Sequence, residues 1–221
     1  MDTQPYGNPR TARILVIGHD PRLQQTDTLA SYCLFADYYF KPVPRLRSER
    51  AKYDLAAALF DYVLFLTNNR FSAEQVMVTN LCNRSLPHAP PSKTVFIPEH
   101  EAREGLTAIR RLLAESTIEI IFAMSVQVNY WLQALGFYTT PTTFVVASRP
   151  KPVGTQHDPP YYEPLKQHTF QMICGNKYVA DNKYLLFPIL HVKQWPLRRG
   201  FVKAYGAAYI NCRNTLNALS L

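Results

Sequence analysis

The sequence predicts an α/β fold with three layers, α/β/α, around a central, mainly parallel four-stranded sheet. Short apolar runs alternate along the chain with amphipathic segments, a pattern typical of parallel strands joined by helices on both faces of a sheet. The chain has 221 residues, of which 47% are hydrophobic and 18% charged, and this suits a packed core. We therefore predict one domain over residues 1–221.

Four apolar runs are the candidate strands, at residues 13–18, 74–80, 118–125 and 184–192. The first, "RILVIG", is rich in β-branched residues and ends at a glycine, which is typical of a buried strand in a parallel sheet. The second, "EQVMVTN", ends in a polar residue at its carboxyl end. Each run is short enough to be a strand and too short to be a complete helix.

Four longer segments have helical periodicity, at residues 48–69, 99–116, 126–137 and 198–219. The segment at 99–116 carries acidic residues in its first turns, where they interact favourably with the helix dipole. Residues 139–183 differ, because prolines and tyrosines are frequent and periodicity is lost. We predict a loop-rich elaboration there.

The chain is basic, with a formal net charge of +8 and a pI of about 9.4. Such a charge attracts polyanions, and DNA, double- or single-stranded, is the first candidate partner. The alternative is that the excess charge is spread over a solvated surface. The position of the basic residues decides between these readings.

Cofactors, metals and membranes are not expected from this sequence. The four cysteines form no C-x-x-C pair, so they are predicted to be reduced core thiols and no metal site is indicated. The glycine-rich fingerprints of dinucleotide and P-loop sites are absent, as is the G-x-S-x-G elbow of hydrolases. No apolar leader or 18-residue apolar window is present. We expect a cytoplasmic (intracellular) monomer.

Three polar residues follow three different predicted strands. Asp20 comes after the first, Asn80 ends the second and His191 lies at the end of the last. In open parallel sheets, ligands bind outside the carboxyl ends of the strands, so these side chains are expected to converge. A carboxylate stabilises a developing cation or orients water, an amide pairs with an amide-like edge, and a histidine hydrogen-bonds developing negative charge. Together they suit cleavage of a bond between a sugar and a base.

The order of these motifs resembles that of the uracil-DNA glycosylase superfamily, from the first strand to the last helix. "GHDPR", at 18–22, corresponds to the family's Gly-Gln-Asp-Pro-Tyr, and "VTN", at 78–80, to a strand that ends in Leu-Leu-Asn. In "HVKQWPLRRGF", at 191–201, the histidine and the later Arg-Gly-Phe match the family's last motif without a gap. This register is the most specific signal, because each short motif alone is weak evidence.

The resemblance implies that a flipped-out base enters a pocket that reads its polar edge. Asp20 and His191 would be catalytic: the aspartate would stabilise an oxocarbenium-like sugar and position water, and the histidine would donate to the leaving base. Asn80 would pair with the uracil edge. The family's base-stacking phenylalanine has no clear counterpart, and Tyr32 and Phe35 are both candidates. No cofactor is required.

Departures from the family motifs bear on specificity. Arg22 replaces the tyrosine that stands against the thymine methyl in uracil-specific enzymes. Trp195 takes the position of the leucine wedge, although a buried tryptophan would instead pin the loop to the core. Further candidate DNA contacts beside it are Lys193, Arg198 and Arg199.

Two other functional classes remain open from the sequence. The altered motifs permit a nucleic-acid-binding protein of the same fold whose chemistry is changed or lost. A small-molecule or protein-binding α/β domain with incidental basic charge is the third possibility. The segment "VPRLRSERAK", at 43–52, is basic, and from sequence we favour a solvated helix start over a DNA contact there.

Overall fold

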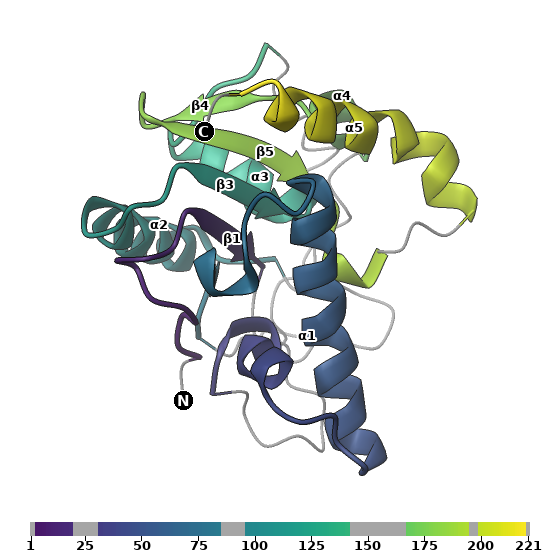
Figure 1. Cartoon of the computed structure of the whole chain (residues 1–221). Coiled ribbons are helices and arrows are strands. Elements are labelled where there is room, and N and C mark those ends of the chain that lie inside the picture. The colour runs from purple at the N-terminus through teal and green to yellow at the C-terminus, as the bar shows by residue number, and fades with distance from the viewer. Residues whose placement is uncertain (1–2, 20–30, 85–95, 142–166, 195–198, 220–221) are drawn as a thin grey trace, which may run out of the picture.

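The protein is an α/β structure built on one mixed five-stranded sheet (Figure 1). The computed structural model describes residues 3–19, 31–84, 96–141, 167–194 and 199–219. The strands are β1 (Ile14–Gly18), β2 (Val76–Asn80), β3 (Ile120–Met124), β4 (Tyr178–Ala180) and β5 (Tyr184–Ile189). Their order across the sheet is β2-β1-β3-β5-β4. Four strands run parallel, and β4 pairs with β5 in the antiparallel direction.

The prediction of a four-stranded sheet is wrong, because β4 adds a fifth strand at one edge. This strand has only three residues, and Val179 in its middle is exposed. A strand this short and half-exposed has no apolar run that would separate it from a loop. It lies inside the segment predicted to be loop-rich, which also contains a short helix.

Helices connect the parallel strands and cover both faces of the sheet. The α-helices of the described part are α1 (Arg47–Leu66), α2 (Glu99–Ala114), α3 (Val126–Ala134), α4 (Gln167–Ile173) and α5 (Arg199–Asn217). Shorter 3-10 turns are η1 (Cys33–Phe40), η2 (Ala73–Gln75) and η3 (Val192–Gln194). The order of strands and helices agrees with the sequence prediction, with ends shifted by a few residues.

Two hydrophobic cores lie on opposite faces of the sheet. Along β1, Ile14 and Val16 pack into one core and Leu15 and Ile17 into the other, as the alternation of side chains in a strand requires. The first core includes residues of α1, α4 and α5, and the second includes residues of α2 and α3. The arrangement is compatible with the predicted three layers.

Helix α1 has the buried face that its periodicity predicts. Leu59, Tyr62, Val63 and Leu66 are fully buried, and Leu55 packs at the edge of the same core. The helix has 20 residues, about 30 Å, whereas a five-residue strand spans about 17 Å. Its first turns therefore extend beyond the sheet, as Figure 1 shows.

No helix in the described ranges is both long enough and apolar enough to cross a membrane.

Candidate functional site

The carboxyl ends of β1, β2, β3 and β5 meet at one edge of the sheet, because these strands are parallel. The register pairs Gly18 with Asn80, and Met124 with Ile189. The chain passes from β1 to β2 on one side and then crosses to β3 on the other side of β1. This reversal makes the end of β1 a topological switch point, where open α/β sheets form their binding crevice.

Asn80 ends β2 at this edge, and its side-chain amide is buried without a hydrogen bond. The residue is 1% exposed, and neither Oδ1 nor Nδ2 has a hydrogen-bond partner among the described residues. Leaving such a group unpaired costs about 1–3 kcal/mol, so proteins rarely keep one without a reason. The amide presents one donor and one acceptor, which is the complement of an amide-like edge of a ligand.

Gly18 makes room for this amide. A Cβ atom added at Gly18 would lie 2.4 Å from Asn80 Oδ1 and 3.4 Å from Leu34 Cδ1. Real Cβ atoms do not approach a heavy atom at the first distance, so any side chain at this position displaces the amide. The glycine that ends the first predicted strand is thus part of the site as well as a strand terminator.

The backbone beside Gly18 is held in an unfavourable conformation. Leu34 and Phe35 both lie in the left-handed region, with φ of 54° and 55°, inside η1. For residues with a Cβ this costs on the order of 1 kcal/mol or more each, and such strain clusters at functional sites. It is compensated here by packing of η1 against β2 and α1.

His191 lies two residues beyond the end of β5, on the same edge, and is half-buried. Its Nδ1 accepts a hydrogen bond from the Lys193 backbone N–H at 3.1 Å. In the neutral imidazole, the ring proton is therefore on Nε2, which makes that nitrogen a donor. This is the state that donation to an electron-rich oxygen requires.

Ser125 follows β3 on the same edge, and the sequence prediction missed it. Its φ of 81° and ψ of 159° fall in a region that glycine favours. Its N–H donates to the Ile189 carbonyl at 3.0 Å, while its buried Oγ has no partner among the described residues. The only available sequence signal was its position, a polar residue directly after the third predicted strand.

Cys33 packs beneath the end of β2. Its Sγ lies 3.2 Å from Asn83 Oδ1 and 3.6 Å from Thr3 Oγ1. Burial raises the pKa of the Cys33 thiol to about 11, so it stays protonated at neutral pH. Like the other three cysteines it is free and buried, which confirms the prediction of reduced core thiols.

The two candidates for base stacking lie in different surroundings. Phe35 is half-buried, with its ring edge-on to Tyr38 at 6.1 Å and Lys52 Nζ 5.8 Å from its centroid. Tyr32 is 37% exposed, and its ring meets Tyr6 edge-on at 5.3 Å. Phe35 belongs to the strained turn beside Gly18, which puts it closer along the chain to the Asn80 amide.

Several predicted site residues lie outside the described residues, namely Asp20, Arg22, Trp195 and Arg198. Asp20 directly follows His19, a buried residue whose carbonyl accepts from the Cys82 N–H at 3.1 Å. Of the predicted DNA contacts, Lys193 is exposed in η3, and Arg199 is the first residue of α5. The structure thus brings Asn80 and His191 to one edge and leaves the others as predictions.

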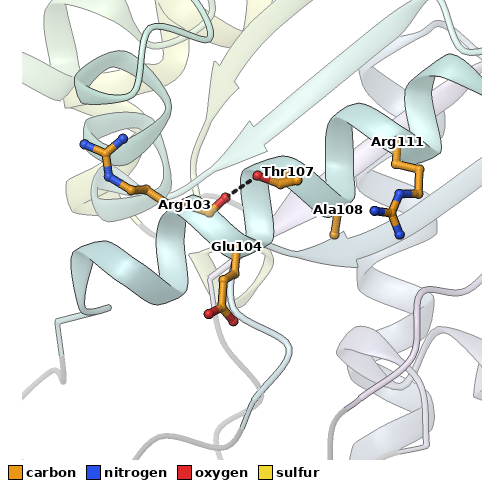
Figure 2. A pocket seen from close by; sticks show the side chains of 5 residues that line it. All are labelled: Arg103, Glu104, Thr107, Ala108 and Arg111. Carbon is orange, nitrogen blue, oxygen red and sulfur yellow. Dashed lines mark hydrogen bonds between the residues drawn. The ribbon is translucent and has the colours of Figure 1, made fainter.

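A shallow pocket elsewhere does not have the features of this site. It lies on the outer face of α2, and Figure 2 shows the residues that line it: Arg103, Glu104, Thr107, Ala108 and Arg111. One helix supplies all of them, and Thr107 Oγ1 already donates to the Arg103 carbonyl at 2.8 Å. No buried, unpaired polar atom faces it among the atoms that the structure describes.

The site is that of an α/β protein with polar groups at the carboxyl edge of its sheet. In comparisons with known proteins, no family model matches the chain and no curated protein matches its sequence. Within the described ranges, no cluster of three His, Cys, Asp or Glu side chains is arranged to hold a metal ion.

Proposed function

We propose that the protein is a DNA glycosylase that hydrolyses the N-glycosidic bond of uracil, or of a related damaged base, flipped out of DNA. The observation that carries the proposal is the buried, unpaired amide of Asn80 at the switch-point edge. A pyrimidine such as uracil offers an adjacent carbonyl acceptor and N–H donor, which would satisfy both polar atoms of this amide.

His191 supports the same chemistry. Its Nε2–H is oriented by the Nδ1 contact to the Lys193 backbone, and it lies on the edge that holds Asn80. Bond cleavage gathers negative charge on the leaving base, and a neutral histidine donor stabilises that charge without prior protonation. Positioning by a fixed backbone contact lowers the cost of orienting the donor during the reaction.

The reaction assigns Asp20 to the sugar. The bond between C1′ and the base nitrogen breaks, the oxygen of water bonds to C1′, and the two water hydrogens end on the new sugar hydroxyl and on the released base. The carboxylate of Asp20 would stabilise the positive charge that develops on the sugar and hold the water. A net charge of +8 supports binding of the phosphate backbone.

The test is base release from labelled oligonucleotides, read as strand cleavage after alkali. Substrates contain uracil opposite guanine, uracil opposite adenine, single-stranded uracil, thymine opposite guanine, hypoxanthine or xanthine. We expect release of at least one base, and loss of release in the Asp20→Asn and His191→Ala variants. Arg22→Tyr is expected to shift the preference toward uracil over thymine.

Two outcomes would refute the proposal. Salt-dependent DNA binding without release of any base would favour the alternative, a nucleic-acid-binding protein of the same fold with altered or lost catalysis. Base release that persists in the Asp20→Ala, His191→Ala double variant would refute the assignment of the site.

A further inference from the structure

A partly apolar, partly cationic surface lies beside the site, on η1 and the start of α1. We name it the η1–α1 surface and define it by Tyr32, Phe40, Val43, Arg45, Leu46 and Arg47. Its apolar members are among the most exposed large hydrophobic residues of the described part, with Leu46 at 70%. Exposed apolar groups at this density generally indicate a binding surface.

The aromatic members of this surface belong to a continuous series of ring contacts. Phe40 stacks on Tyr6 with centroids 5.7 Å apart, and Tyr32 meets the other side of the series edge-on. Tyr6 forms a backbone bridge to Val78 in β2, two residues before Asn80. The exposed rings therefore begin next to the strand that carries the unpaired amide.

The cationic members lack acidic partners. Arg45 and Arg47 are exposed, and neither forms an ion pair with any residue in the described ranges. The next basic residues along α1 are neutralised, since Arg50 pairs with Asp54 at 2.8 Å and Lys52 with Glu49 at 2.9 Å. Two uncompensated charges thus lie at the start of the helix.

The start of α1 is on the same side of the molecule as the candidate site. The helix packs against η3, which begins directly after His191. Its first nine residues include none that is fully buried where burial is described, and Figure 1 shows them projecting past the sheet. Sequence alone favoured a solvated helix start here, and this position is what argues against that interpretation.

We infer that the η1–α1 surface binds the nucleic acid strand next to the target nucleotide, and that it binds this strand unpaired. The inference rests on the proposed function and specifies its substrate as single-stranded DNA. Arginines without acidic partners suit phosphates, and exposed rings with Leu46 suit the faces of unstacked bases. A duplex offers phosphates but keeps its base faces stacked inside, so it would leave the apolar members of the surface without contacts.

The experiment measures binding of a labelled strand of about 12 thymidines, which contains no uracil, by fluorescence anisotropy between about 50 and 200 mM salt. The Arg45→Ala, Arg47→Ala double variant should lose about 1.4 in the slope of log affinity against log salt, and about tenfold or more in affinity at about 0.1 M salt. Leu46→Ala should lose about threefold.

Matched controls separate these effects from net charge and from general loss of apolar surface. The Arg10→Ala, Arg111→Ala variant removes the same charge from exposed positions at the opposite edge of the sheet, and its slope should not change. Ile210→Ala removes an apolar side chain that is 60% exposed on α5, and its affinity should not change. The Arg45→Lys, Arg47→Lys variant retains the charge and should retain the slope.

Equal losses in the two arginine pairs would overturn the inference, as would equal losses with a duplex of the same length. Capture of a protein partner that competes with neither form of DNA would also overturn it. Base release is measured on the same variants. DNA binding that depends on Arg45 and Arg47 without base release would refute only the proposed function, and base release with no dependence on the pair would refute only this inference.

Discussion

Two buried asparagines near the same edge of the sheet differ in almost every contact. Asn129, in α3, is 0% exposed and fully bonded: its Nδ2 donates to the Ala123 and Ser125 carbonyls at 2.8 Å each. Its Oδ1 accepts from the Tyr138 hydroxyl at 2.7 Å. Asn80 is equally buried, and neither of its side-chain atoms has a partner in the part of the chain that the structure describes.

The difference separates a structural amide from a functional one. Asn129 ties the end of β3 to α3 and holds the unusual backbone of Ser125, so its hydrogen bonds stabilise the fold. Asn80 has the desolvation cost without the bonds, which makes sense if a ligand completes it. Substitutions at the two positions should therefore have opposite signatures.

The largest expected effect is on catalysis. Asn80→Ala should reduce base release by about 100- to 1,000-fold, the range for removing one fixed donor from an active site. The free energy of unfolding should stay the same or rise by up to about 1 kcal/mol, because no hydrogen bond is lost. Single-turnover base release and urea unfolding measure the two quantities. Unfolding that is weakened by several kcal/mol would show that Asn80 is structural after all.

The next effect is on stability. Asn129→Ala should lower the free energy of unfolding by about 2–3 kcal/mol, because it leaves the Tyr138 hydroxyl and two carbonyls without their partner. Base release by the folded fraction should change far less than in Asn80→Ala. Urea unfolding followed by circular dichroism gives the first value. If Asn129→Ala were as inactive as Asn80→Ala while still folded, the contrast between the two residues would fail.

Gly18→Ala tests how tightly the amide of Asn80 is placed. The added Cβ would lie 2.4 Å from Asn80 Oδ1, so the amide must turn away from its position. We expect about a tenfold loss of base release, with a stability cost of about 1 kcal/mol. Full activity in this variant would show that the amide is free to move, and hence that it is not held ready for a ligand.

The smallest effect concerns the dryness of the core below Asn80. The pKa of Cys33 is raised to about 11 by burial, above the usual value of a free thiol. Between about pH 9 and 11, the unfolded thiol is ionised and the folded one is not, so stability falls as pH rises. Relative to Cys33→Ala, the natural chain should lose about 1 kcal/mol between about pH 9 and 10. Parallel stability curves would indicate that water reaches Cys33.

Regular elements were predictable because each carries a local pattern. The run that forms β1 is buried at all five positions, and the apolar spacing of α2 places Leu106, Ile109 and Leu113 in the core, as its periodicity predicts. The antiparallel β4 was missed because three residues carry too little pattern, and its pairing with β5 supplies the order that its sequence lacks.

The polar residues of the site were predictable only as positions. Strand ends located Asn80 and His191, and parallel pairing then put them on one edge. The sequence did not distinguish Asn80 from Asn129, nor did it single out Ser125. The same residue type serves as a bonded strut in one place and an unpaired amide in the other, depending on which groups the fold brings to it.

By itself, the sequence determined the alternation of strands and helices, the buried faces and the basic charge, because periodicity and composition are local properties of the chain. Only the tertiary structure decided which polar groups remain without partners, and that Gly18, 62 positions from Asn80 in the chain, makes room for its amide. It also placed the first turns of α1 beside the site. Hydrogen bonding and steric space depend on groups from distant segments, which meet only when the chain folds.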